Sequence, residues 1–408
     1  MRRRARLLIA GAVIGVSILS GWDAPAEASD LRAMPWSDPE ATPLVFNVMA
    51  QPSAVKGSDG RLHLLYELQI GNAAPKAATL ERVSVLDVAS AAPIAGFDAA
   101  AVAQRFEIGA DRERLANRLE SAQFGVLFLH LAFNSPGDIP NAIAHQIDIT
   151  LDPDEPSKAQ KLSLRGAMTW PRTTPAVVLG APLQGRNYLA GDGCCESVRH
   201  IRALLPLDGR FWLAQRFAID WEQIDDQNRI FVGDPKDVNS YHIFGKTVFA
   251  VADGRVTSAR NDLPEQVPHD PQGVTLETAD GNHVLQDIGN NAYVLYAHMQ
   301  KGSVLVEEGT MLHKGQPIGL VGNTGNSFAP HLHLHVVTAP YPLAGDGQPY
   351  VFERFALTGV DAAGTSDFDK GEAQGTPLAI TPISPPSQHA AELPLDLTVV
   401  DWLNGGAR

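Results

Sequence analysis

Residues Gly322–Val337 read GNTGNSFAPHLHLHVV, in which three histidines alternate with leucines behind a turn of glycine, asparagine, threonine and serine. Residues two positions apart in a β-strand lie on the same face, so His331, His333 and His335 are predicted to share one face and the leucines the other. Neutral imidazole is the commonest metal ligand and a good general base near pH 7. The stretch is therefore either one side of a functional groove or a solvated strand, and the preceding residues distinguish the two.

Several motifs precede this stretch. FAIDW places Asp220 at the end of an expected strand, VFAVADGRV at Val248–Val256 predicts two strands joined by a tight Asp-Gly turn, and YVLYAHM carries His298. The run GQPIGLVGNTG then spaces glycines ahead of the histidines. Together these motifs resemble the lysostaphin-type (duplicated hybrid motif) zinc metallopeptidase family, whose members cut cell-wall peptides. The family pattern reads roughly H-x-G-x-D, V-x-A-x-x-D-G-x-V, Y-A-H, G-Q-x-I-G-x-x-G-N-T-G and H-L-H, and the resemblance covers residues of about 176–337.

The resemblance implies a compact antiparallel β-domain with a groove that holds one zinc ion. By their position in the motifs, Asp220 and His333 match two zinc ligands, and His298 and His331 match the two histidines that orient water and stabilise the oxyanion. Zinc with three protein ligands leaves a position for water and lowers its pKa toward about 7. The nearby imidazoles would then act as base and hydrogen-bond donor. His335 matches no functional position, and we expect it to be structural or to support a ligand.

One departure from the family pattern concerns the first zinc ligand. The residue four positions before Asp220 is Arg216, and the central glycine of the motif is replaced by Ala218. A guanidinium stays protonated and cannot bind zinc, and its charge would repel the cation. Three hypotheses follow: another residue supplies the third ligand, Arg216 replaces the metal through a salt bridge with Asp220, or metal binds only when substrate is present.

The third ligand has several candidates in the sequence. His200 is favoured because it lies on the segment that leads into the Asp220 strand, close behind the only two cysteines. These cysteines are neighbours, a spacing that rarely forms a disulfide, so they are two free thiols, a vicinal disulfide or a turn close to a metal. The other candidates are Cys194, Cys195, His242 and His283.

The N-terminus has the features of a secretory signal. MRRRARLL supplies a positive region, LLIAGAVIGVSILSGW an apolar region, and AEA at 26–28 a cleavage site before Ser29. The apolar run is shorter than the roughly 20 residues of a bilayer span; an uncleaved N-terminal anchor is the alternative. We expect residues 1–28 to be removed, the mature protein to be exported to the periplasm, the cell envelope or the medium, and no stable membrane span to remain.

The rest of the 408 residues is expected to form two or three domains of an all-β protein. Strand patterns separated by turns, such as RLHLLYELQIGN and FGVLFLHLAF, predict an Ig-like β-sandwich over residues 29–170. The lysostaphin-type domain is expected over 176–340, and a mostly loop-like tail with one late strand, LPLDLTVV, over 341–408. Three histidines within the sandwich strand patterns are expected to be structural: His63, His130 and His145.

The charge balance narrows the function. The chain has 46 acidic and 32 basic residues and a formal net charge of −14, which argues against binding to nucleic acid or anionic membranes.

We predict an exported zinc metalloendopeptidase that cleaves peptidoglycan peptides, with one zinc ion held by Asp220, His333 and His200. The alternative, favoured by Arg216, is a non-catalytic domain of the same fold that binds cell-wall peptides or regulates a hydrolase. The sandwich is a candidate surface for a protein partner.

Overall fold

The computed structural model describes residues 41–402 apart from 110, 153–158 and 173. Strands dominate and the sheets are antiparallel apart from one short pair, so the predicted all-β class is confirmed. The described residues from Thr42 onward pack as one compact unit. The expected signal peptide, residues 1–28, lies outside the described residues.

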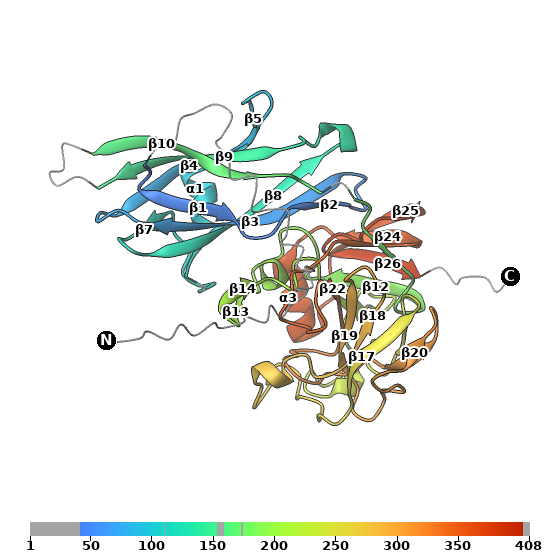
Figure 1. Cartoon of the computed structure of the whole chain (residues 1–408). Helices are drawn as coiled ribbons and strands as arrows, with labels where there is room; N and C mark the ends of the chain where they lie inside the picture. The colour runs from blue at the N-terminus through green and yellow to red at the C-terminus, as the bar shows by residue number, and fades with distance from the viewer. Residues whose placement is uncertain (1–40, 110, 153–158, 173, 403–408) are drawn as a thin grey trace, which may run out of the picture. The chain divides into compact units, whose positions relative to one another are not determined.

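The first domain is a sandwich of two five-stranded antiparallel sheets that share one hydrophobic core (Figure 1). A two-layer sandwich is thus present where the strand patterns predicted one, and its Ig-like topology stays a prediction. The first sheet has the order β1 (Leu44–Val48), β3 (Leu62–Asn72), β8 (Phe124–Phe133), β6 (Phe106–Ile108), with β2 (Ser53–Lys56) also on β3; the second has the order β10 (Gln160–Thr169), β9 (Ile143–Leu151), β4 (Ala78–Asp87), β5 (Pro93–Asp98), with β7 (Arg118–Leu119) also on β4, and α1 (Ala99–Ala103) follows β5.

Strand β3 is buried on both faces, which the sequence pattern did not reveal. Leu64 and Tyr66 point into the core of the sandwich, whereas Leu65 packs into the core of the second domain and Glu67 is 2% exposed. Strand β8 is arranged in the same way, since Leu127 lies in the sandwich core and Phe128 packs on residues from the second domain. The first sheet of the sandwich therefore also serves as packing surface for the second domain.

His145 is buried within the sandwich, as expected of a structural residue, and its burial makes the stability of the sandwich depend on pH. Its Nδ1–H donates to the Ala167 carbonyl at 2.9 Å, and its Nε2 accepts from the Tyr66 hydroxyl at 2.9 Å. Burial lowers the pKa of His145 to about 4, because the interior opposes its charged form. The unfolded chain therefore binds a proton below about pH 6.5 that the folded chain excludes.

We predict that acidification from pH 7 to pH 4 lowers the free energy of unfolding by about 3 kcal/mol through His145 alone. Denaturant unfolding of the parent protein and of His145→Gln across this range measures the difference in slope against pH. The variant is expected to start less stable and to lose less stability on acidification. Parallel curves for the two proteins would contradict the assignment, and the exposed His313→Ala serves as a control that should follow the parent.

The second domain is built on one ten-stranded antiparallel sheet, in which segments distant in sequence lie side by side. Two neighbouring strands of this sheet, β15 and β22, carry Asp220 and His333 of the candidate site. Two further pairs are antiparallel and one is parallel. The sheet has the order β20 (Met311–Leu312), β17 (Gly254–Arg260), β18 (Asn282–Asp287), β19 (Tyr293–Met299), β22 (Leu332–Val337), β15 (Ile219–Gln223), β12 (Gly185–Gly191), β26 (Thr398–Trp402), β24 (Phe355–Asp361), β25 (Ile380–His389), and the pairs are β11 (Val177–Leu179) with β23 (Tyr350–Phe352), β13 (Leu205–Leu207) with β14 (Arg210–Trp212), and β16 (Thr247–Phe249) with β21 (Pro317–Leu320).

The alternation of histidine and leucine in β22 has the predicted consequence. Leu332 and Leu334 are fully buried in the main core of the domain, beside Trp221 and Tyr296. The VFAVADGRV motif also forms two strands with a turn between them. These two strands do not pair with each other, however, because β16 joins β21 and β17 joins β18 and β20.

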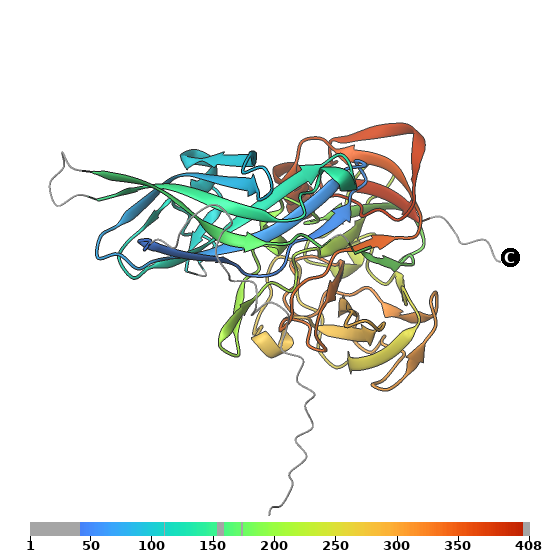
Figure 2. The same ribbon diagram turned by 45° about the horizontal axis from the view of Figure 1, so that its top comes forward.

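The prediction of a mostly loop-like C-terminal tail is wrong. Strands β24, β25 and β26 continue the ten-stranded sheet beyond β12, as Figures 1 and 2 show in red beside green. A helix, α3 (Thr365–Gln374), connects β24 to β25 and buries Phe368. The outermost strand, β25, contains the prolines of the sequence ITPISPPSQH, and proline is tolerated in an edge strand because one side of that strand has no pairing partner.

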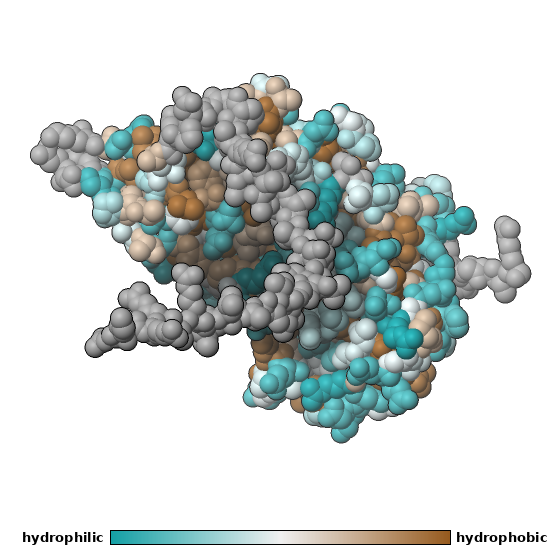
Figure 3. Space-filling view, viewed as in Figure 1, coloured by the Kyte–Doolittle hydropathy of each residue, from teal (hydrophilic) through white to brown (hydrophobic). Residues whose placement is uncertain are grey.

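Across the described part of the chain, no helix combines the length and the apolar composition that crossing a bilayer would require. The face of the second domain that carries β17, β18 and β20 is largely hydrophilic in the space-filling view (Figure 3).

Candidate metal centre

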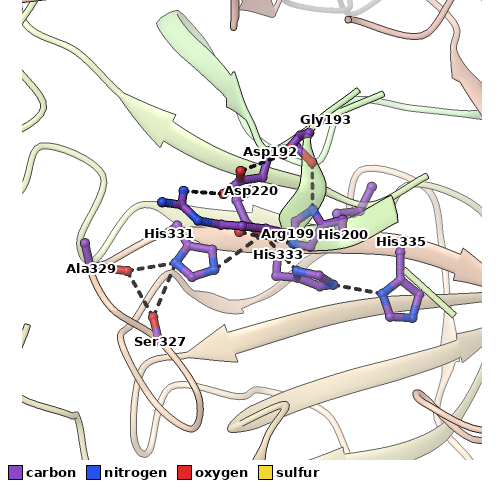
Figure 4. A network of polar contacts seen from close by, with 12 residues as sticks. Asp192, Gly193, Arg199, His200, Asp220, Ser327, Ala329, His331, His333 and His335 are labelled. Atoms are coloured by element: carbon purple, nitrogen blue, oxygen red, sulfur yellow. Dashed lines mark hydrogen bonds and ion pairs between the residues drawn. The ribbon is translucent and has the colours of Figure 1, made fainter. Parts of the chain in front are cut away.

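Two neighbouring strands bring Asp220 and His333 together. Strand β15 pairs with β22 so that Asp220 lies directly opposite His333. Cross-strand neighbours on one face are close enough for their side chains to touch. His333 Nδ1 lies 2.8 Å from Asp220 Oδ1, and His331 Nε2 lies 3.4 Å from the same oxygen (Figure 4). The two residues that the resemblance assigned as zinc ligands therefore share one point in the fold.

His200 reaches the same carboxylate from the other side. It lies in α2 (Val198–Ile201), a single helical turn on the segment between β12 and β13, and its Nε2 is 3.3 Å from Asp220 Oδ2. One donor atom from each of His200, Asp220 and His333 falls within 4.8 Å of the others. The structure thus brings together the three residues of the sequence prediction, with His200 favoured among the candidate third ligands.

The other candidates for the third ligand have partners elsewhere. His242 lies 3.7 Å from Asp225, and His283 contacts Ser258 and the Gly281 carbonyl. The two cysteines, Cys194 and Cys195, form a disulfide with each other, which the sequence left open and neighbouring cysteines rarely do. Their sulfur atoms are therefore not thiolate ligands in this structure.

Backbone carbonyls determine which nitrogen of each imidazole faces the site. A carbonyl oxygen only accepts, so a ring nitrogen within hydrogen-bond distance of one must carry the hydrogen. The Nδ1 atoms of three rings donate in this way, which leaves each Nε2 without a hydrogen in the neutral ring. The pairs are His200 with the Asp192 carbonyl at 2.8 Å, His298 with that of Thr324 at 2.8 Å, and His331 with that of Ala329 at 2.7 Å.

In His333 the hydrogen is on Nε2 instead, because of a hydrogen bond to His335. His335 Nε2–H donates to the Pro342 carbonyl at 3.1 Å, so its Nδ1 accepts from His333 Nε2–H at 2.8 Å. His333 therefore presents a bare Nδ1 to Asp220. His335, which matched no functional position, supports a ligand in the way that hydrogen-bonded partners orient metal-binding histidines.

The pKa values of the side chains in the site are shifted by burial and by their charged neighbours. Burial opposes the ionisation of Asp220, but the imidazoles of His200, His331 and His333 outweigh it and hold its pKa well below the usual range. Burial likewise opposes the charge of His200, but Asp220 outweighs it and raises the pKa of His200 to about 9. Burial lowers the pKa of His298 and of His333. At neutral pH the site thus pairs an ionised Asp220 with a protonated His200, beside the neutral rings of His298 and His333.

These donors fit a zinc ion. An imidazole nitrogen without a hydrogen and a carboxylate oxygen repel each other at 2.8 Å, so the approach of His333 to Asp220 requires a proton or a metal cation between them. Two imidazoles and one carboxylate are a donor set that zinc prefers, and three protein ligands leave one position open. His331 Nε2 is buried without a hydrogen-bond partner. A second group, His298, His331 and His333, also has one donor atom each within 4.8 Å and lacks a carboxylate.

Arg216 points away from this site. Its guanidinium forms two hydrogen bonds of 2.8 Å with the carboxylate of Glu67 on β3, and Nη1 donates to the Gly347 carbonyl at 3.0 Å. The hypothesis that Arg216 replaces the metal through a salt bridge with Asp220 is therefore wrong. Its charge is neutralised by Glu67, and it does not oppose a cation at Asp220.

The metal centre opens into a cavity of about 460 Å³. Sequence reasoning missed several residues of its wall: Arg112, Arg199, Glu222 and Glu372. Glu222 follows Asp220 by two positions and so shares its strand face, a signal that was available; Glu372, on α3, offered none. Burial raises the pKa of Glu372 to about 7, and burial together with the Glu372 carboxyl raises that of Glu222 well above its usual range.

A carboxylate and two histidines are a donor set that occurs in zinc-dependent hydrolases. Residues 239–345 match the model of peptidase family M23, and this part of the chain is a lysostaphin-type M23 peptidase domain. The matched range includes His298, His331 and His333. It excludes His200, Arg216 and Asp220, so the family match alone does not assign the remaining ligands.

One curated relative and two solved structures illustrate the similarity. Peptidoglycan DD-endopeptidase ShyA from Vibrio cholerae is 40% identical over 63 residues, which are 15% of this chain and 14% of that protein. The catalytic domain of the prophage-encoded M23 protein EnpA from Enterococcus faecalis is 19% identical, covering 41% of this chain and 92% of that one with a TM-score of 0.25. The catalytic domain of lysostaphin from Staphylococcus simulans is also 19% identical, covering 39% of this chain and 88% of that one with a TM-score of 0.21.

Proposed function

We propose that the chain is an exported zinc-dependent endopeptidase that hydrolyses peptide bonds in peptidoglycan. The observation that carries this proposal is the convergence of His200 Nε2, Asp220 and His333 Nδ1 on one point at the wall of a cavity. In the neutral form of each ring, this nitrogen is the one that the ring's other hydrogen bond leaves without a hydrogen, and zinc would displace the proton that His200 Nε2 carries beside Asp220. These three residues would hold one zinc ion, with His200 supplying the ligand that Arg216 cannot.

Zinc bound there would lower the pKa of a water molecule toward about 7 and polarise an amide carbonyl. The chain's own contribution is to handle protons beside it. His298 and His331 each present Nε2 to the site, held by the carbonyls of Thr324 and Ala329. One of the two can accept the proton of the attacking water, and the other, once protonated, can donate a hydrogen bond to the developing oxyanion.

The substrate assignment is supported by family and by similarity. An M23 domain occupies residues 239–345, and the relative from Vibrio cholerae is named a peptidoglycan DD-endopeptidase. Peptidoglycan lies outside the cytoplasm, which agrees with the secretory signal expected at residues 1–28. The proposed place of action is therefore the periplasm, the cell envelope or the medium.

The proposal is tested with purified mature protein, stripped of metal by a chelator and then given one equivalent of zinc. We expect the zinc-loaded protein to release soluble fragments from purified cross-linked peptidoglycan, with one new amino group for each bond cut. The chelated protein should release none. Failure to bind zinc would overturn the proposal. Full zinc loading without new amino groups would instead favour the non-catalytic alternative, which sedimentation with the same peptidoglycan would examine.

A further inference from the structure

The segment that carries His200 has little regular structure of its own. It runs from the end of β12 at Gly191 to the start of β13 at Leu205, and α2 is only four residues long. Within the segment, the His200 ring is held by the Asp192 carbonyl, and Asp192 also binds Ser197 and Arg199. A metal ligand on such a loop requires outside support, because ligand sites need positions accurate to about 0.5 Å.

The β-sandwich supplies polar contacts on both sides of His200. Glu196 accepts from Arg105 Nη1 and from His130 Nδ1, each at 2.8 Å. The Arg199 carbonyl accepts from Arg112 Nη1 at 3.2 Å, and Arg202 Nη2 donates to the Gln104 carbonyl at 2.8 Å. The sandwich thus holds the chain four residues before His200, one residue before it and two residues after it.

Apolar side chains also pack between the sandwich and the end of the His200 segment. Val126 and Phe128 of β8 form one buried cluster with Ala203, Leu204 and Leu213 of the second domain. The guanidinium of Arg202 also lies over the Phe128 ring, 5.6 Å from its centre. The end of the His200 segment, at Ala203 and Leu204, therefore packs on the sandwich, while Ile201 packs in the main core of the second domain.

The segment that leads into the Asp220 strand is also bound to the sandwich. Arg216, four positions before Asp220, is 5% exposed and forms a bidentate pair with Glu67, which is 2% exposed. At the position where the family pattern has a histidine ligand, this chain therefore has a contact with its N-terminal domain. In the proposed ligand set His200 takes the place of that histidine, and its segment contacts the same domain.

We propose that the β-sandwich is a structural part of the metal centre, and that Glu196 is the positioning residue through which it holds His200 toward Asp220. The inference rests on the proposed role of His200 as a zinc ligand. Glu196 contacts Arg105 and His130 but not His200 itself, so its loss should weaken zinc binding less than the roughly 10–100-fold that follows loss of a direct partner of a metal ligand. The Glu196 side chain is 52% exposed and its ion pair with Arg105 lies at the surface, so its loss should cost little folding stability.

The test uses the full mature chain with Glu196→Ala and Glu196→Gln. A chromophoric chelator that competes for zinc measures affinity, and the visible spectrum of the cobalt-loaded protein reports ligand geometry. We expect zinc affinity to fall by about 3–10-fold in Glu196→Ala, below the range for a direct partner of a metal ligand, with a changed cobalt spectrum. Glu196→Gln should lose less, because its amide oxygen still accepts from His130. In metal-free Glu196→Ala, amide hydrogen exchange should be faster over residues 198–204.

The matched control is Glu353→Ala, which removes another exposed carboxylate from a surface ion pair, that with Lys314. It should keep the parent's zinc affinity and cobalt spectrum. Parent-like affinity and spectrum in Glu196→Ala would overturn this inference alone. Parent-like zinc affinity in His200→Ala would overturn the ligand assignment, and absence of zinc from the parent would overturn the proposed function. Thermal unfolding in excess chelator confirms that each variant is folded before its affinity is compared.

Discussion

Replacing His200 with alanine is expected to reduce the zinc content of the purified protein from about one ion per chain to nearly none, and to abolish hydrolysis. The variant leaves Asp220 and His333 as the remaining members of the proposed ligand set, and two protein ligands with water hold zinc weakly. His200 also provides the Nε2 that faces Asp220 Oδ2 at 3.3 Å. Elemental analysis after gel filtration measures the zinc, and release of new amino groups from peptidoglycan measures activity.

The matched controls are His242→Ala and His283→Ala, which remove the other two candidate histidines of the sequence. Both rings have partners away from the metal centre, so both variants should retain about one zinc per chain. A His200→Ala protein that keeps its zinc while His283→Ala or His242→Ala loses it would show that the third ligand is assigned to the wrong residue.

Replacing His298 or His331 with alanine is expected to have a different result: zinc is retained while turnover falls by roughly 10²–10⁴-fold. Both residues present Nε2 to the cavity and donate Nδ1–H to a backbone carbonyl. Loss of such a proton acceptor or donor acts on the transition state, so kcat should fall far more than KM changes. Steady-state kinetics on a defined cross-linked peptide, with zinc content measured on the same samples, separate the two effects.

His313 offers a control for these two variants, because its side chain is 83% exposed and lies in a turn. His313→Ala should match the parent in both zinc content and kcat. Loss of zinc from His298→Ala or His331→Ala would contradict their assignment as proton-handling residues. It would favour the alternative group in which these two histidines bind the metal together with His333.

Local patterns were sufficient to predict the part of the site that lies on paired strands. The alternation in HLHLH placed the leucines in the core and the histidines in the site, because the side-chain period of a strand is two. The Asp220 strand was recognised from its motif, and pairing of β15 with β22 brings that residue opposite His333. Both facts depend only on neighbouring residues and on antiparallel pairing.

The role of Arg216 could not be predicted from the sequence around it. Its partner, Glu67, lies 149 positions earlier, on a strand whose alternation gave no sign of burial on both faces. His200 was favoured for its place before the Asp220 strand, but the hydrogen bond that its Nδ1–H donates to the Asp192 carbonyl, which orients the ring, appears only in the fold. Contacts between distant segments decide both residues, and a single sequence does not display them.

The C-terminal region was misread for a different reason. The loop was predicted from SPPS and from the scarcity of periodic runs; SPPS lies within β25, although proline removes a backbone donor from a sheet. Strand β25 is the last strand of its sheet, so one of its two edges has no partner strand among the described residues. Edge position therefore explains both the tolerated prolines and the failed prediction.

The most direct test is anomalous X-ray diffraction at the zinc absorption edge, from crystals of the zinc-loaded mature protein. One peak is expected within about 2.0–2.3 Å of His200 Nε2, an Asp220 carboxylate oxygen and His333 Nδ1, with Arg216 still bound to Glu67. A peak among His298, His331 and His333, or no peak at these residues, would contradict the proposed metal centre.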